Sequence, residues 1–195
     1  MVDGNQVISV STDGKVNWRK TLGEEGVFFY DIEALDETTL IVSDFGRGVF
    51  LSVDAGSGDI QPYLRDVKIK GLARFEIAKA GIFAVSWGAD DAWDSALHLI
   101  SPGGKAKMLT SGFGNLESVE VIDGKVVVGG YRGHETFPNT KLMRVGLDGT
   151  VKPLAPAAAT KGVSDMYFEG SSVWLTYFYD AAFERVPAQT LWGTK

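Results

Sequence analysis

The sequence predicts an all-β fold built from repeats. A short apolar strand followed by a glycine-bearing turn occurs four times, with the strands starting at Val7, Phe50, Leu97 and Leu142. The spacings between these starts are 43, 47 and 45 residues. The 24 glycines suit many tight turns between strands. Repeats of this length made of short strands are typical of a β-propeller, in which each repeat forms one four-stranded blade.

Alternating apolar residues and turn residues divide the chain into four blades plus a half-blade. In the first full repeat we expect strands at residues 30–35, 40–44, 49–53 and 60–65, lettered a to d from the propeller axis outward. The half-blade supplies only strands c and d, at the N-terminus. We expect a single domain over residues 1–195, with repeats at residues 5–23, 29–66, 72–112, 116–157 and 163–195.

The half-blade bears on how the ring closes. We expect residues 6–22 to pair in one sheet with residues 164–178, because an open ring leaves two unpaired edges. A small closed ring of four blades would result. The alternatives are that the chain is part of a larger propeller, or that another chain closes its open edge. Another division, with Asp3-Gly4 as an a–b turn and residues 7–10 as strand b, changes the half-blade but not the fold class.

Composition excludes several classes of function. The formal charge of −6 argues against a nucleic-acid partner, which needs a concentrated positive field. The chain contains no cysteine, so it has no disulfides, thiolate nucleophiles or cysteine-based metal sites. No apolar run approaches the ~18 residues that span a bilayer, and the chain as given begins without the features of a signal peptide. We expect a soluble chain with no membrane partner, and composition leaves its compartment open.

Parts of the repeats resemble known propeller families. Residues 10–18 and 53–60 resemble the quinoprotein-type (PQQ-like) repeat, whose pattern is roughly Asp-x-x-Thr-Gly-x-x-x-Trp. Residues 163–175 are similar to NHL and streptogramin-lyase-like repeats. The resemblance implies a propeller fold and no single function, because these repeats serve very different proteins. The tryptophan position is Pro62 or Tyr63 in the second repeat and is lost in the third, so we do not expect a quinone cofactor.

Superimposing the four predicted a strands places polar residues in register. One acidic column contains Glu33, Glu76 and Glu120 with Tyr167, and the second, two residues earlier on the same side, contains Asp31, Arg74, Ser118 and Asp165. Strand a is innermost, so these carboxylates could crowd at the central channel. They would then raise one another's pKa or bind a hard cation such as Ca²⁺ or Mg²⁺, the only cofactor we consider. The alternative is inter-blade hydrogen bonding and pairing with Arg74.

The loops between strands b and c should all lie on one face of the propeller. We call this the b–c loop face and define it as residues 44–48, 87–95, 131–140 and 178–181. Its aromatic and charged side chains suit a protein or a glycan partner. The predicted binding residues are Phe45, Arg47, Trp87, Asp90, Asp91, Trp93, Asp94, Tyr131, Arg132, His134 and Tyr179. We expect Trp87, Trp93, Tyr131 and His134 to lie outside the core. The alternative for the aromatic residues is a capping layer over the ring.

Catalytic motifs are scarce. In the lyase-like propellers that the repeat resembles, a histidine performs acid–base chemistry, which implies that role for His134 with Glu135 beside it. The other histidine, His98, lies among apolar residues and is expected to be a sheet residue. No Ser-His-Asp, phosphate-binding or zinc motif occurs at a recognisable spacing.

Three functions remain open from the sequence. The preferred one is noncatalytic binding of a protein or a glycan at the b–c loop face. The second is a small lyase-like or lactonase-like enzyme with a divalent cation near Glu33, Glu76 and Glu120. The third is a structural module of a larger assembly or oligomer, which would use the half-blade edge for strand addition.

Overall fold

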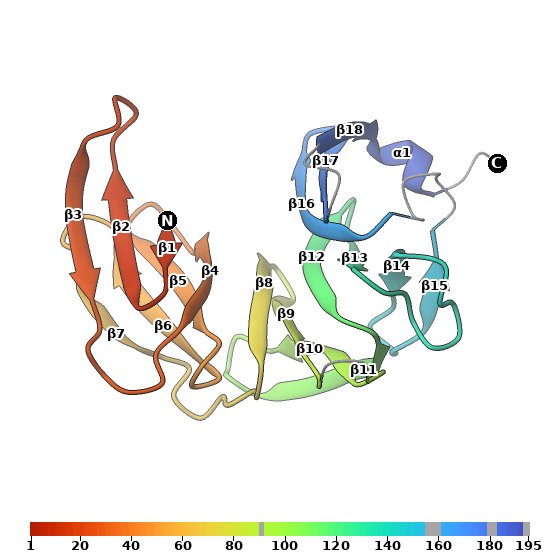
Figure 1. Ribbon diagram of the computed structural model, residues 1–195, viewed down its shortest axis with the longest axis horizontal. Coiled ribbons are helices and arrows are strands. Elements are labelled where there is room, and N and C mark those ends of the chain that lie inside the picture. The colour runs from red at the N-terminus through yellow and green to blue at the C-terminus, as the bar shows by residue number, and fades with distance from the viewer. Residues whose placement is uncertain (90–91, 155–160, 179–182, 193–195) are drawn as a thin grey trace.

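The computed structural model describes residues 1–89, 92–154, 161–178 and 183–192. In this part of the chain, five small antiparallel sheets follow one another in sequence order around an arc (Figure 1). This is an all-β, five-bladed-like propeller arrangement. No helix among the described residues is long and apolar enough to cross a membrane.

The first two sheets contain three and four strands. The first consists of β1 (Val2–Asp3), β2 (Gln6–Val10) and β3 (Val16–Thr21). The second consists of β4 (Phe29–Ala34), β5 (Thr39–Asp44), β6 (Val49–Asp54) and β7 (Ile60–Tyr63).

The remaining three sheets contain four, four and three strands within the described residues. The third consists of β8 (Leu72–Ala78), β9 (Gly81–Ser86), β10 (Ser95–Ile100) and β11 (Ala106–Phe113). The fourth consists of β12 (Leu116–Ile122), β13 (Lys125–Gly130), β14 (Leu142–Val145) and β15 (Val151–Pro153). The fifth consists of β16 (Val163–Glu169), β17 (Ser172–Tyr177) and β18 (Phe183–Pro187), followed by the short helix α1 (Ala188–Leu191).

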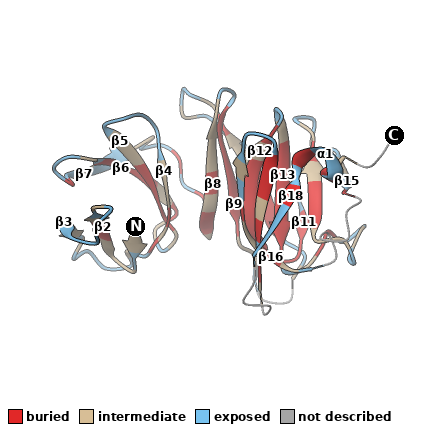
Figure 2. Cartoon of the chain, turned by 90° about the horizontal axis from the view of Figure 1, so that it is seen from above, coloured by how far each residue is buried: buried red, intermediate tan, exposed pale blue. Residues whose placement is uncertain are grey.

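The hydrophobic core is divided among the boundaries between neighbouring sheets. Val42 and Leu51 pack in the cluster at the first boundary, and Phe50 and Phe75 in the cluster at the second. Two larger clusters fill the third and fourth boundaries. Figure 2 shows the consequence: the middle strands are buried, whereas the outer strands β3 and β7 are largely exposed. Each sheet therefore depends on its neighbours to bury its faces.

Neighbouring sheets are joined by contacts between the outermost strand of one sheet, or the residue after it, and a turn of the next sheet. The indole N–H of Trp18 donates to the carbonyl oxygen of Ala55 at 3.0 Å. Gly58 has a φ of +76°, and a Cβ there would lie 2.7 Å from the Trp18 ring. Leu64 packs in the same way at Gly104, and the backbone of Leu109 approaches Gly149. At the second and third boundaries, Leu64 and Leu109 thus take the place that Trp18 has at the first.

The half-blade and its closure differ from expectation. β1 pairs with β2, so the first sheet has three strands, and Asp3-Gly4 lies at the turn between them, as the alternative division expected. The prediction that residues 6–22 pair with residues 164–178 is wrong, because β2 and β3 form one sheet with β1, and β16 and β17 form a separate sheet with β18. The first and last sheets lie on opposite sides of the arc in Figure 1.

Candidate functional site

The innermost strands bring both acidic columns to one place. β4 packs beside β8, β8 beside β12, and β12 beside β16. These four strands line a cavity of about 290 Å³, which we call the axial cavity. Among the described residues, every member of the two columns except Ser118 lines it. The repeat therefore brought these side chains to one cavity, as expected for residues on the innermost strands.

Arg74 is the cation of the axial cavity. Its Nη1 lies 3.0 Å from Oδ2 of Asp165 and 3.5 Å from Oδ1 of Asp31. Asp31 is 8% exposed, and its Oδ2 accepts a hydrogen bond from the backbone N–H of Phe75 at 3.0 Å. Burial raises the pKa of Asp31, and the Arg74 charge opposes that shift. Arg74 therefore links three sheets through two carboxylates.

The three glutamates of the first column are not equivalent. Glu120 accepts backbone N–H groups from Val121 at 3.1 Å and from Phe168 at 3.2 Å. Glu33 and Glu76 have no hydrogen bond or ion pair within the described part of the chain. Burial, reinforced by neighbouring carboxylates, raises the pKa of Glu33 to about 7 and that of Glu76 to about 8. Both carboxyl groups are therefore largely protonated in mildly acidic solution.

The three glutamates share a cavity without forming a ready ligand set. No group of three or more histidine, aspartate or glutamate side chains among the described residues is placed to hold a metal ion. The predicted cation near Glu33, Glu76 and Glu120 stays a prediction, and it would require these side chains to move together.

An aromatic cluster lies near the axial cavity, where Cζ of Arg74 is 5.9 Å from the centroid of the Tyr30 ring. The ring of Trp87 lies 5.1 Å from the rings of both Tyr30 and Phe45. The Tyr30 hydroxyl donates to Oε2 of Glu117 at 3.1 Å, and burial raises the pKa of Glu117 to about 7. The indole N–H of Trp87 is buried near this carboxyl group without a full hydrogen bond. Phe45 and Trp87 are half-buried and pack against the core cluster of the third boundary.

Tyr30 and Glu117 were missed by the sequence analysis. Each lies where the pairing of its a strand is interrupted, between Phe29 and Asp31 in β4 and between Leu116 and Ser118 in β12. A β-bulge of this kind adds one residue and redirects its side chain. Strict alternation along a strand cannot predict such a change of face.

The long loops of the third and fourth sheets meet on the b–c loop face. A Cβ at Gly114 would lie 2.8 Å from Cβ of Arg132 and 3.2 Å from Cζ3 of Trp93, so both side chains close over this glycine. Tyr131 packs edge-on against Phe178, with ring centroids 5.9 Å apart. Trp93 and Tyr131 nevertheless remain 37% and 39% exposed.

Two other predicted binding residues hold their own loops together. Nε of Arg47 donates to the buried carboxylate of Asp44 at 2.6 Å, and its guanidinium also pairs with Glu24. Asp94 accepts the backbone N–H of Ala89 at 3.2 Å. Asp90, Asp91 and Tyr179 lie outside the described residues.

His134 is buried, which corrects the prediction that it lies outside the core. It is 8% exposed, and its ring lies 4.9 Å from that of Phe113. Its Nδ1 accepts the backbone N–H of Thr136 at 3.1 Å, so Nε2 carries the proton and donates to the carbonyl of Ser111 at 3.1 Å. The reason is that the loop folds back to pair His134 with Phe113 in a β-bridge.

The predicted pair of His134 and Glu135 therefore lacks a free histidine nitrogen, and no hydrogen bond joins the two side chains. His98 lies in β10, as expected, where its Nε2 is 2.9 Å from the Ser86 hydroxyl. Burial lowers the pKa of His98.

Comparison with known proteins supports the fold alone. No family model matches the sequence, and no curated protein matches it. Among solved structures, regucalcin from Agrobacterium tumefaciens, described as a calcium-binding protein, aligns with a TM-score of 0.68 and 13% identity, covering 94% of this chain and 64% of that one. A chain of a nidogen/laminin complex aligns with a TM-score of 0.66 and 10% identity, covering 91% and 65%.

A catalytically inactive virginiamycin B lyase from Staphylococcus aureus, solved with quinupristin, aligns with a TM-score of 0.61 and 12% identity. The alignment covers 95% of this chain and 64% of the lyase. The chain thus spans just under two thirds of the length of these three structures. They include both an enzyme and a chain of a protein–protein complex, so the shared fold does not select a function.

Proposed function

We propose that this chain is a noncatalytic binding module that holds a protein or a glycan on its b–c loop face. The observation that carries the proposal is the exposure of aromatic side chains there: Trp93 is 37% exposed and Tyr131 is 39% exposed. Phe28, whose carbonyl accepts the N–H of Phe45 in the first of these loops, is 48% exposed.

The surroundings of these side chains support a binding role. Trp93 rests on Gly114, and Tyr131 rests on Phe178, so both rings are held in place while each residue stays more than one third exposed. An aromatic ring fixed in this way loses little conformational entropy when a partner covers it. Such rings can anchor a protein segment or stack on the apolar face of a sugar.

The state of His134 favours binding over catalysis. It is the only histidine on the b–c loop face, and both ring nitrogens are engaged by backbone groups. A general acid or base must be able to exchange its proton with a substrate. His134 would first have to give up two hydrogen bonds and leave its site against Phe113.

Truncation of the exposed aromatic side chains tests the proposal. An array of immobilised glycans and a displayed peptide library would supply the ligand, and calorimetry would measure its affinity for the intact chain. We expect Trp93→Ala and Tyr131→Ala each to weaken binding by about 1–2 kcal/mol, or roughly 5- to 30-fold. Leu35→Ala is the matched control, because Leu35 is also 39% exposed but follows β4 on the opposite side.

Retention of full affinity by both aromatic variants would refute the proposed face. So would a weakening equal to that of Leu35→Ala. Ligands recovered only from the glycan array, or only from the peptide library, would decide between the two partner classes.

The axial cavity favours a second candidate function, a lyase-like or lactonase-like enzyme with a divalent cation. Its specific support is that Glu33 and Glu76 border the same cavity without partners in the described chain. A melting temperature that rises with Ca²⁺ through these two residues would favour it. The third candidate, strand addition in a larger assembly, draws support from the separate first and last sheets.

A further inference from the structure

A second cavity lies at the boundary between the third and fourth sheets. Its volume is about 460 Å³, and we call it the boundary cavity. The residues that line it come from β8, β9, β12, β13, β14 and β15 and from the turns that join them in pairs. These turns lie on the side opposite the b–c loops, so the boundary cavity is separate from the face proposed above.

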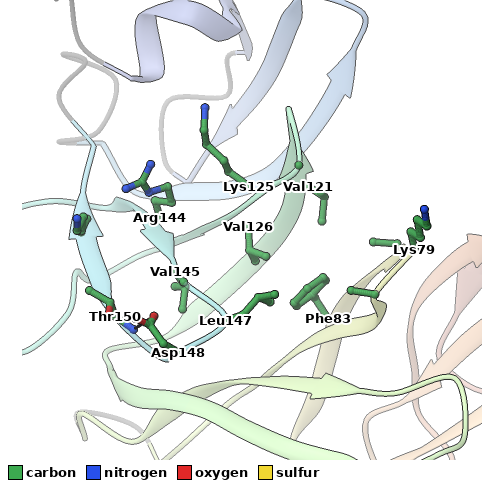
Figure 3. A pocket seen from close by; sticks show the side chains of 15 residues that line it. Lys79, Phe83, Val121, Lys125, Val126, Arg144, Val145, Leu147, Asp148 and Thr150 are labelled. Carbon is green, nitrogen blue, oxygen red and sulfur yellow. Dashed lines mark hydrogen bonds between the residues drawn. The ribbon is translucent and has the colours of Figure 1, made fainter.

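The middle of the boundary cavity is apolar. Figure 3 shows Phe83, Val121, Val126 and Leu147 close together, with the charged side chains around them. Phe83 and Val126 are buried in the core, whereas Leu147 is 56% exposed at the edge. The cavity therefore offers an apolar wall that a ring-sized or short-chain group could cover.

The first boundary shows how such a gap is closed elsewhere in the molecule. There the indole of Trp18 packs on Gly58 and donates to Ala55. At the third boundary the corresponding approach to a turn glycine is made by the backbone of Leu109 at Gly149. No tryptophan closes that boundary in the described chain, and a cavity is present.

The charged residues that border the boundary cavity are mostly cationic. Four carry a positive charge, namely Lys79, Lys125, Arg144 and Lys152, and Asp148 is the one carboxylate among the described lining residues. Asp148 accepts the backbone N–H of Thr150 at 3.0 Å, which is the main reason that its pKa is lowered. In a chain with a net charge of −6, this is a local reversal of sign.

The protein compensates the cations only in part, because among the described residues their one attraction to a carboxylate joins Lys152 to Asp148. Arg144 and Lys152 are direct cross-strand partners in β14 and β15, a position at which like charges are unfavourable. Neither residue, nor Lys79, has an ion pair within the part of the chain that the structure describes. Lys125 has its Nζ over the Trp192 ring, 3.9 Å from the centroid. An external anion at this rim would relieve the repulsion.

We propose that the boundary cavity binds a small amphiphilic anion, in which a carboxylate or sulfonate is joined to an aromatic or short aliphatic body. The body would cover Phe83, Val126 and Leu147, and the anionic group would face the rim cations. This proposal does not depend on the proposed function, because the two sites lie on opposite sides of the sheets.

A matched pair of probes separates the two parts of this proposal. The probes are 1-anilinonaphthalene-8-sulfonate and N-phenyl-1-naphthylamine, which has the same rings without the sulfonate. Fluorescence titration of the intact chain should show one saturable sulfonate site. We expect the neutral probe to bind about tenfold more weakly, because it lacks the sulfonate that would face the rim cations.

Two double variants test the rim. Lys79→Glu with Lys152→Glu should weaken binding of the sulfonate about tenfold and leave binding of the neutral probe within about twofold. Lys68→Glu with Lys70→Glu is the control, because it changes the net charge equally at exposed positions beside Ile69, whose backbone N–H donates to the carbonyl oxygen of Gly48 on the b–c loop side. It should leave the affinity for both probes within about twofold.

Filling the apolar part should weaken binding of both probes. Val121→Phe is the first variant and Ala78→Leu the second, with circular dichroism confirming that at least one of them folds. Trp93→Ala should leave probe binding unchanged, which distinguishes failure here from failure of the proposed function. Equal affinity for the two probes, an equal effect of the two double variants, or undiminished binding in a folded filled variant would overturn the proposal.

Discussion

The axial cavity and the boundary cavity share strand β12 but have opposite character. Glu120 borders the first, and Val121, the next residue, borders the second. Among the described lining residues, the axial cavity has five carboxylates and one cation, whereas the boundary cavity has four cations and one carboxylate. Alternation along a single strand thus separates two chemical environments. The net charge of a chain says little about either one.

The two cavities also differ in how their charges are solvated. Burial raises the pKa values of four half-buried or buried carboxylates in the axial cavity, those of Asp31, Glu33, Glu76 and Glu120. The carboxylate of the boundary cavity is exposed, and a backbone hydrogen bond lowers its pKa. The difference teaches that the position of a carboxyl group within the stack of sheets determines the direction of its pKa shift.

Replacing the arginine of each cavity should show the largest difference in stability between the two cavities. Arg74→Ala leaves the buried Asp31 carboxylate without its cation, so we expect the free energy of unfolding at pH 7 to fall by about 3 kcal/mol. The loss should shrink as the pH falls, because protonation of Asp31 removes the unpaired charge. Urea unfolding at several pH values measures both effects.

Arg144→Ala is the matched control in the boundary cavity. Arg144 has no ion pair within the described chain, so we expect a change of no more than about 0.5 kcal/mol. If Arg74→Ala and Arg144→Ala lowered the free energy of unfolding by similar amounts, the proposed difference between the cavities would be wrong.

The pH dependence of stability should differ in sign between the cavities. Glu76 has a pKa of about 8 in the folded chain against an ordinary value of 4.5, so the folded state holds its proton more tightly than the unfolded state. Its contribution is therefore full below about pH 4.5 and is lost as the pH rises towards 8. Because Glu76 is partly exposed, we expect a moderate effect. The free energy of unfolding of Glu76→Gln should exceed that of the wild type by about 1 kcal/mol at high pH.

Asp148→Asn is the comparison from the boundary cavity. The lowered pKa of Asp148 gives a contribution that is present at neutral pH and is lost on acidification, which is the opposite direction. Urea midpoints measured from pH 5 to 9 should therefore lie above those of the wild type at the alkaline end for Glu76→Gln. They should not do so for Asp148→Asn. Parallel pH profiles for the wild type and Glu76→Gln would contradict this assignment.

Adding Ca²⁺ should change the stability of the chain least. Because no described set of side chains in the axial cavity is arranged to hold a metal ion, we expect millimolar Ca²⁺ or Mg²⁺ to leave the melting temperature unchanged at pH 8.5. The wild type and the double variant Glu33→Gln with Glu76→Gln would be compared by thermal unfolding. A rise that increases with Ca²⁺ and disappears in the double variant would instead support the enzyme candidate.

The sequence by itself predicted the repeat and the strands of the three central sheets. The strand expected at residues 40–44 is β5 (Thr39–Asp44), and the acidic columns converge on the axis as their register indicated. These features depend on residues close together in the sequence: alternation along a strand, turn residues between strands, and one period applied to every blade.

The tertiary structure decided what depends on contacts between distant segments. The separate first and last sheets follow from which strand edges β1 and β18 occupy, and no local pattern encodes that choice. The burial of His134 follows from a bridge to Phe113, and the place of Glu117 follows from a bulge in β12. The boundary cavity depends on how closely two sheets approach each other. A repeat pattern specifies each sheet and its facing residues, whereas the free energy of packing one sheet on the next fixes closure, cavities and pKa shifts.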